Sequence, residues 1–220
     1  MEREIQAPGE YYHICGRGDK KQTLFRHKRD YLRFIFNILY LQSDRRFYNT
    51  SRYVDYYEDS RDFRIDNDVV AEIAKDRHIE LAAFCLMPNH YHLIVKNISE
   101  KGVSKYMHRV LIGFANYFNT KYDDVSGHVF EGAYNLIHIS SDAQLQYLFS
   151  YVHKNPKELP KWRNNYWDYT WSSCRDLAGN NRWGDLLSDE IIRDQFSDFT
   201  EYKKFLQESS AKGGFEPPQV

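Results

Sequence analysis

Apolar and polar residues alternate with different periods along this chain, and each change of period marks the boundary of an expected element. Residues 11–15 are mostly apolar, which predicts a short strand, and Gly16 and Gly18 after it predict a tight turn with positive φ. Apolar positions recur at helical spacing in residues 28–41, which predicts a helix. Residues 43–66 show no clean period, and we interpret them as an irregular insertion.

The middle of the sequence predicts a helix, a β-hairpin and a second, longer helix. Residues 68–78 have a helical pattern, and residues 81–86 are apolar enough for a buried strand. Residues 87–89 interrupt that strand and the next one begins at His90, so the two strands form a hairpin. In residues 103–122 one stripe of the expected helix is apolar, and we assign this stripe to the core rather than to a cofactor site.

The second half of the chain predicts one more strand and one more helix. Gly127 and Gly132 bracket a loop, and residues 135–139 alternate in polarity as a strand does. Asp142 is the expected N-cap of the following helix, which Pro156 ends because proline cannot continue a helix.

The expected order of elements is strand, helix, strand, strand, helix, strand. This order matches a ferredoxin-like split β-α-β arrangement, an α+β fold with one antiparallel sheet and helices on its faces. The helix that begins near Asp142 is then appended after the last strand.

Composition and cysteine spacing narrow the class of protein. A chain of 220 residues with 42% hydrophobic and 16% aromatic residues can bury a substantial core. No stretch approaches the ~20 apolar residues of a membrane span, and Met1-Glu2-Arg3-Glu4 does not begin a signal peptide. Cys15, Cys85 and Cys174 are too scattered for a disulfide framework. These features favour a cytoplasmic protein with no membrane partner.

Charge is unevenly distributed, although the formal net charge is −1 and the isoelectric point is near 6.8. A near-neutral total gives no global support for a nucleic-acid partner. A local basic segment could contact phosphates, and its candidate residues are Arg17, Lys20, Lys21, Arg26, Lys28 and Arg29. The commoner alternative for such a segment is a solvated loop and helix face.

Two histidines stand at the start of the second hairpin strand. Side chains alternate across a strand, so His90 and His92 lie on one face. Two imidazoles side by side can bind one divalent metal ion and leave its other positions open for a substrate oxygen. Two alternatives remain: half-buried histidines in hydrogen bonds, or a structural zinc site, which would usually bring paired cysteines.

A tyrosine and an amide on the last helix supply further candidate chemistry. Tyr147, Tyr151 and Asn155 are spaced by four residues and share one polar stripe. With two strand histidines they provide the parts for phosphodiester transfer, in which a metal polarises the phosphate and a tyrosine hydroxyl attacks it. The chain has 18 tyrosines, so most pack in the structure, and the spacing alone leaves both Tyr147 and Tyr151 open as the nucleophile.

Several motifs follow one another in a fixed order along the chain. They are Tyr12-His13-Ile14-Cys15-Gly16-Arg17-Gly18, Cys85-Leu86-Met87-Pro88-Asn89-His90-Tyr91-His92-Leu93-Ile94-Val95, Ala115-Asn116-Tyr117-Phe118-Asn119, Gly127-His128-Val129-Phe130-Glu131-Gly132, Tyr151-Val152-His153-Lys154-Asn155-Pro156 and Trp171-Ser172-Ser173. In this order they resemble the single-tyrosine HUH transposases, in particular the REP-associated tyrosine transposases. The resemblance implies a transposase-like domain over residues 1–179 and, over residues 180–220, a helical C-terminal extension with a disordered tail.

The resemblance assigns roles by position. His90 and His92 match the two metal-binding histidines, Tyr151 matches the nucleophile, and Asn155 matches the polar residue that completes the metal site. His128 becomes a candidate DNA contact, with a solvated loop histidine as the alternative. His153 is expected to point away from the metal.

The implied activity is a metal-dependent DNA strand transferase and endonuclease that acts on single-stranded or hairpin DNA. Its cofactor would be Mg²⁺ or Mn²⁺, because a site of imidazoles and an amide oxygen with open positions suits phosphoryl chemistry. Members include monomers and dimers, so a homodimer stays open. Two rival functions are an RNA-binding or RNA-processing ferredoxin-like domain and a domesticated DNA-binding protein without catalysis.

Overall fold

Four antiparallel strands form the sheet at the centre of the computed structural model, which describes residues 6–122, 128–177 and 181–211. The strands are β1 Tyr11–Arg17, β2 Ile79–Met87, β3 His90–Asn97 and β4 Asn135–Ile139. Their order across the sheet is β2-β3-β1-β4, and every pair is antiparallel. This is the ferredoxin-like arrangement of an α+β fold, as the sequence predicts.

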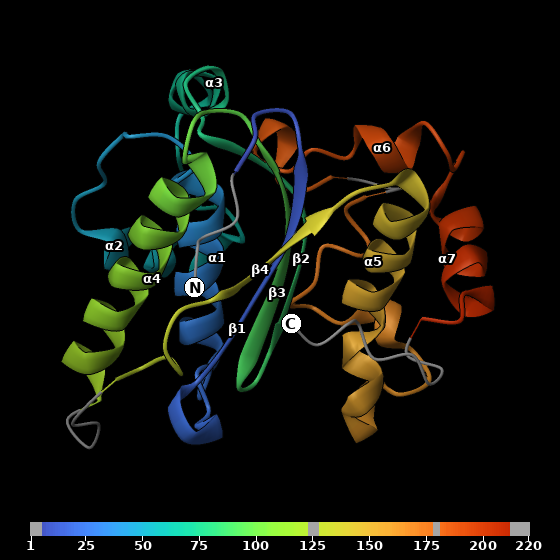
Figure 1. The fold of residues 1–220 in the computed structure, drawn as a ribbon. Coiled ribbons are helices and arrows are strands. Elements are labelled where there is room, and N and C mark those ends of the chain that lie inside the picture. The colour runs from blue at the N-terminus through green and yellow to red at the C-terminus, as the bar shows by residue number, and fades with distance from the viewer. Residues whose placement is uncertain (1–5, 123–127, 178–180, 212–220) are drawn as a thin grey trace.

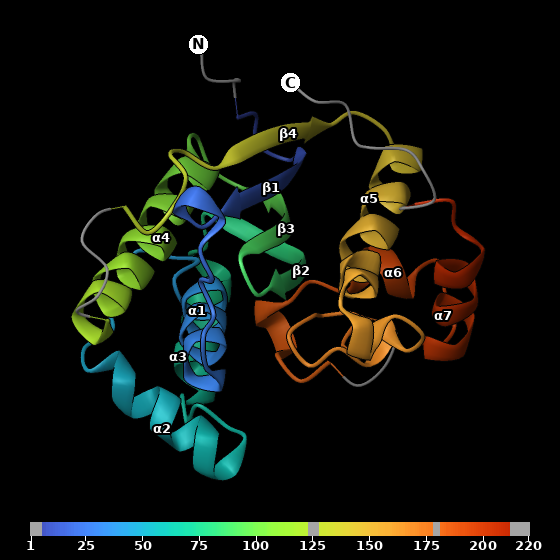
Figure 2. The same ribbon diagram turned by 90° about the horizontal axis from the view of Figure 1, so that it is seen from below.

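Helices cover both faces of the sheet (Figures 1 and 2). On one face lie α1 Lys28–Tyr40 and α4 Gly102–Lys121, which pack on each other and on the hairpin strands. The opposite face is covered by α5 Asp142–Lys154, with α6 Glu190–Arg193 and α7 Phe199–Glu208 beyond it. Short 3-10 turns occur at Asp19–Lys21, Asn155–Glu158, Pro160–Trp162, Tyr166–Asp168 and Gly184–Leu186.

A buried carboxylate joins the two helices of the first face. Asp30 on α1 accepts hydrogen bonds from Lys121 at 2.6 Å, Tyr117 at 2.7 Å and Tyr122 at 2.8 Å. Burial would raise the pKa of Asp30, but these donors and the His27 backbone N–H outweigh it and lower that pKa. The charge on Asp30 is therefore satisfied inside the protein, and α1 and α4 are held in one relative position.

The strand β2 lies at one edge of the sheet, and residues 171–173, the Trp-Ser-Ser motif, cover this edge. Leu86 N–H donates to the Trp171 carbonyl at 2.9 Å, and Ser173 N–H donates to the Phe84 carbonyl at 3.0 Å. Unpaired strand edges tend to associate with other chains. This segment therefore closes one edge of the sheet and lies beside the strand that precedes the two histidines.

Several details differ from the sequence prediction. Residues 43–66 are not an irregular insertion, because α2 Thr50–Ser60 lies within them. Its only buried residues are Val54 and Tyr57, which is too few to produce a clear period. The helix predicted near residues 68–78 is α3 Asn67–Lys75.

The predicted turn at Gly16 and Gly18 is also wrong, since neither residue has positive φ. Gly16 lies inside β1, where a Cβ would come within 2.4 Å of the Tyr91 hydroxyl, and at Gly18 it would come within 2.3 Å of the Gln22 carbonyl. Close approach, not turn geometry, requires both glycines. The N-cap of α5 is Ser141, whose side chain accepts from Gln144 N–H, so Asp142 is the first helical residue instead.

None of the helices in the described ranges is long and apolar enough to cross a membrane. The division at residue 179 stays a prediction. The expected disordered tail falls on residues 212–220, which lie outside the described part of the chain.

Candidate metal and nucleophile site

Strand register places the two histidines on the sheet face that α5 covers. His92 pairs with Cys15 on β1 and Cys85 on β2, while His90 pairs with Arg17 and Met87. Paired residues of antiparallel strands point to the same side. His90 and His92 therefore project from one face, as predicted, and their ring centroids are 5.1 Å apart with perpendicular planes.

His92 is held by a third histidine that the sequence analysis did not single out. Its Nδ1 lies 3.0 Å from Nε2 of His13 on β1, and the two rings stack with centroids 5.2 Å apart. His13 is 1% exposed, and burial lowers its pKa to about 4. The His13 ring is therefore neutral near pH 7.

His90, like His92, has a hydrogen-bond partner at Nδ1, because this nitrogen lies 2.8 Å from Oδ1 of Asn89. An amide oxygen only accepts hydrogen bonds, so in this arrangement His90 Nδ1 carries the hydrogen and the lone pair is on Nε2. Metal-binding histidines are usually fixed in this way, with one ring nitrogen donating and the other ligating. The pair fits a divalent cation on this criterion.

Tyr151 on α5 lies against the histidines. Its ring meets that of His92 edge-on at a centroid distance of 5.5 Å and that of His13 at 6.1 Å. These rings come from α5, β3 and β1, and only the docking of α5 on the sheet brings them together. The structure thus joins the predicted nucleophile to a predicted ligand.

Asn155 lies one turn beyond Tyr151, at the end of α5, and is fully buried. Its Nδ2 lies 3.0 Å from the Tyr151 carbonyl and 3.3 Å from the Val152 carbonyl. These contacts fix the amide plane, and Oδ1 is the atom of this amide with the chemistry to bind a cation. Within the described residues, no group of three or more His, Cys, Asp and Glu could hold a metal ion.

A buried hydrogen-bond chain anchors α5 to both of its neighbours. Tyr202 on α7 lies 2.6 Å from Nδ1 of His153, and Nε2 of His153 lies 3.0 Å from Oγ of Ser173. Burial lowers the pKa of His153 to about 3, so the ring is neutral. Ser173 Oγ in turn donates to the Phe84 carbonyl on β2 at 3.2 Å. As predicted, His153 is directed away from the candidate metal ligands, and its contacts fix the helix that carries Tyr151.

The basic segment lies directly beside the turn at Pro88 and Asn89, which precedes His90. Gly18 N–H donates to the Asn89 carbonyl at 2.9 Å, and the N–H groups of Leu24 and Phe25 donate to the Pro88 carbonyl at 2.9 and 3.1 Å. Gln22 donates to the carbonyl of His128 at 3.1 Å. The backbone that presents the basic side chains therefore also supports His90.

The predicted phosphate contacts differ in their surroundings. Arg17, Lys20, Lys21, Lys28 and His128 are exposed. In contrast, the Arg26 guanidinium stacks 4.4 Å from the Tyr122 ring centroid. Arg29 binds Asp55 at 2.5 Å and Glu58 at 2.9 Å, both on α2. Because two carboxylates neutralise Arg29, we leave it out of the proposed DNA surface.

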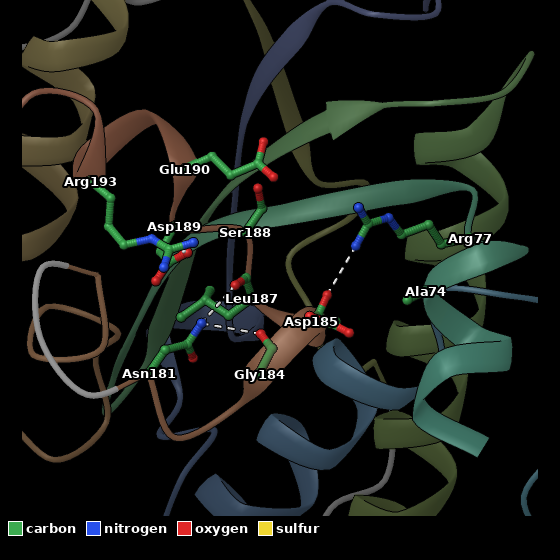
Figure 3. Close-up of a pocket in the computed structure, with 10 residues that line it drawn as sticks. All are labelled: Ala74, Arg77, Asn181, Gly184, Asp185, Leu187, Ser188, Asp189, Glu190 and Arg193. Carbon is green, nitrogen blue, oxygen red and sulfur yellow. Dashed lines mark hydrogen bonds and ion pairs between the residues drawn. The ribbon is translucent and has the colours of Figure 1, made fainter. Parts of the chain in front are cut away.

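A separate polar pocket of about 350 Å³ lies between α3 and residues 181–193 (Figure 3). Arg77 donates to the Asp185 carbonyl at 3.0 Å, and Arg193 pairs with Asp189 at 3.1 Å. Its arginines are thus engaged by neighbouring oxygens. The pocket shares no lining residue with the histidine site, and we assign it to the junction between α3 and the C-terminal segment.

Two histidines in the site region thus have roles that the sequence did not reveal. His13 and His153 both interrupt apolar runs, at Tyr12-His13-Ile14 and Val152-His153. A polar residue in such a run signals a buried hydrogen-bond partner. The sequence does not say which partner, because His13 and His92 are 79 positions apart.

Comparisons with known proteins find two similarities to transposases. Residues 56–155 match the profile of a family described as "Transposase IS200 like". No curated protein matches the sequence. A solved structure described as "Structure of the REP associates tyrosine transposase bound to a REP hairpin" matches with a TM-score of 0.52 at 12% identity, over 79% of this chain and 81% of that chain. The resemblance predicted from the motifs is confirmed: the chain matches the IS200-like transposase family and has the fold of a REP-associated tyrosine transposase.

Proposed function

We propose that this protein is a metal-dependent DNA endonuclease and strand transferase, acting on single-stranded or hairpin DNA with Tyr151 as its nucleophile. The observation that carries the proposal is the edge-on contact of the Tyr151 ring with His92, at 5.5 Å between centroids. It puts a hydroxyl-bearing side chain beside one of two histidines suited to a cation. The match to an IS200-like transposase family supports the same reaction class.

The reaction exchanges one phosphate ester for another. The Tyr151 hydroxyl oxygen forms a bond to phosphorus, and the bond from phosphorus to the 3′ oxygen of the preceding nucleotide breaks. The phenolic proton is transferred, in net terms, to that leaving 3′ oxygen. The products are a 5′-phosphotyrosine and a free 3′-hydroxyl, so a second 3′-hydroxyl can reverse the step and join strands without an external energy source.

The residues fit Mg²⁺ or Mn²⁺, with His90, His92 and the Asn155 amide oxygen as its ligands. When bound there, the cation would supply charge stabilisation to the phosphate under attack. The protein itself contributes the positions of the ligands and of Tyr151. His13 and Asn89 orient the two imidazoles, and the His153 chain holds α5 so that Tyr151 faces them.

DNA would approach over the exposed basic residues next to the turn at Pro88 and Asn89. Arg17 is the Cα partner of His90, and Lys20 and Lys21 follow in the adjoining turn. The near-neutral protein thus concentrates positive charge where a phosphodiester must be held. The hairpin in the similar solved structure is consistent with a DNA ligand of this shape.

The decisive test compares Tyr151→Phe with Tyr147→Phe, a matched change one helical turn earlier. Each removes only a hydroxyl, so the fold should survive. We would incubate each protein with a pool of DNA hairpins flanked by randomised single strands, in Mn²⁺, and look for labelled protein on denaturing gels. Wild type and Tyr147→Phe should retain a 3′-end label but no 5′-end label, whereas Tyr151→Phe should form no adduct.

Four results would contradict the proposal in different ways. An adduct that persists in Tyr151→Phe and disappears in Tyr147→Phe would move the nucleophile to Tyr147. Retention of the 5′-end label would reverse the polarity of the linkage. Wild-type protein that forms no adduct would overturn covalent catalysis, and an adduct that forms equally well when EDTA is present from the start would overturn its metal dependence.

A further inference from the structure

We propose that His13 is a positioning residue that holds His92 in the tautomer able to bind a metal ion. The proposal rests on the function proposed above, because it concerns the same site. Its basis is the 3.0 Å contact between His13 Nε2 and His92 Nδ1. The stacked geometry, with ring planes 8° apart, shows that the two imidazoles are side by side on neighbouring strands.

Only one hydrogen lies between these two nitrogens, and its position decides what His92 can do. If His92 Nδ1 donates, the lone pair of His92 is on Nε2, which can then bind a cation. If His13 Nε2 donates instead, His92 Nε2 carries the hydrogen and cannot be a ligand. The metal-bound state therefore requires His13 to be the acceptor.

Of the two His13 nitrogens, only Nε2 has a hydrogen-bond partner in the described part of the chain, and that partner is His92. The other nitrogen, Nδ1, is buried without a partner among the described residues. A buried histidine with a purely structural role usually satisfies both nitrogens, as His153 does through Tyr202 and Ser173. His13 instead directs its one hydrogen-bonded nitrogen at His92, and a hydrogen-bond partner at the second nitrogen is what fixes the tautomer and ring orientation of a metal-binding histidine.

Register explains how the sheet produces this contact. His13 and Cys15 lie on the same side of β1, and Cys15 is the Cα partner of His92. His13 is thus a diagonal neighbour of His92 on the face that α5 covers, and its ring also meets Tyr151 edge-on. One buried residue therefore contacts both a predicted ligand and the predicted nucleophile.

The test measures Mn²⁺ affinity without DNA, from the electron paramagnetic resonance signal of free Mn²⁺. His13→Leu removes the acceptor and keeps an apolar side chain, whereas His13→Gln offers a side-chain oxygen near the place of Nε2. We expect affinity to fall about 10- to 100-fold in His13→Leu, the range for loss of such a partner, and to return to within a few-fold in His13→Gln. His138→Leu, on the neighbouring strand β4, should bind as wild type does.

A second measurement does not depend on a variant that folds. Nitrogen-15 spectra of the histidines in wild-type protein with Mg²⁺ should show His92 protonated on Nδ1. Protonation on Nε2 in the presence of Mg²⁺ would overturn the proposal.

His92→Ala separates failure of this inference from failure of the proposed function. If His92→Ala loses Mn²⁺ binding but His13→Leu keeps wild-type affinity, the positioning role is wrong while the metal site stands. If His92→Ala itself binds Mn²⁺ like wild type, the metal site is wrong and the role of His13 falls with it. Equal losses in His13→Leu and His13→Gln would show that packing, not the acceptor, is what His92 needs.

Discussion

At the scale of single residues, burial determines the charge of His13 and His153, and their hydrogen-bond partners determine what each of them holds in place. Desolvation lowers the pKa of His13 to about 4 and that of His153 to about 3, so both are neutral near pH 7. His153 has a partner at each nitrogen, while His13 has one and directs it at His92. His153 therefore anchors α5, whereas His13 is placed to orient His92, the role that we propose for it.

Of the proposed metal ligands, His90 is the one whose removal should cost least stability, because it is only half-buried at a strand end. We expect His90→Ala to reduce covalent DNA adduct by at least about 100-fold, equivalent to about 3 kcal/mol of lost stabilisation. The free energy of unfolding should change by less than about 1 kcal/mol. Urea denaturation and gel quantification measure the two effects, with His138→Ala as the control.

A parallel loss of stability and adduct in His90→Ala would instead assign His90 a structural role. An unchanged adduct yield would remove His90 from the metal site. In either case the two-histidine hypothesis would be wrong at this position.

At the scale of elements, the docking of α5 decides whether a site exists at all. Its histidine partners are on β1 and β3, and its anchors are on α7 and beside β2. The α5 helix carries the proposed nucleophile but makes none of the sheet's hydrogen bonds, so its position depends on side-chain contacts. Those contacts include a C-terminal helix that lies far from the site in sequence (Figure 2).

Tyr202→Phe tests this anchoring. The substitution removes one hydroxyl and leaves Nδ1 of His153 without its partner in a fully buried position. We expect the free energy of unfolding to fall by about 1–3 kcal/mol, the cost of an unsatisfied buried polar group. Tyr48→Phe, at a side chain that is 75% exposed, should stay within about 0.5 kcal/mol of wild type.

Urea denaturation of the two variants gives the comparison directly. Equal stability in Tyr202→Phe and Tyr48→Phe would show that the bond to His153 contributes nothing to the docking of α5. The helix would then be held by its apolar contacts alone.

At the scale of the whole molecule, charge is local rather than global. The formal net charge is −1, yet exposed basic residues gather at the turn that supports His90. Long-range attraction from the total charge is therefore weak, and phosphate contacts at this surface must provide the affinity.

Reversal of Lys20 and Lys21 to Glu should weaken binding to single-stranded or hairpin DNA. It should also flatten the dependence of log affinity on log salt by about 0.7 for each phosphate that the protein no longer neutralises. The control reverses Lys75 and Lys204, which are exposed on α3 and α7, and changes net charge by the same amount. Fluorescence anisotropy titrations over a series of salt concentrations measure both. The same weakening in both double variants would mean that total charge, not this surface, attracts DNA.

The sequence by itself determined the features that depend on local periodicity. Alternation put His90 and His92 on one face, helical spacing put Tyr151 and Asn155 on one stripe, and the order of elements predicted the antiparallel sheet. The α2 helix was missed because its only buried residues are Val54 and Tyr57, and two positions do not establish a period.

Only the tertiary structure decided which distant residues meet. The register of β1 against β3 brings His13 to His92, the docking of α5 brings Tyr151 to both, and the packing of α2 on α1 takes Arg29 into ion pairs. Such contacts depend on how whole elements pack together rather than on neighbours in the sequence. For this protein, the sequence therefore predicts which residues share a strand face or a helix stripe, whereas the fold determines which of these residues come together in one site.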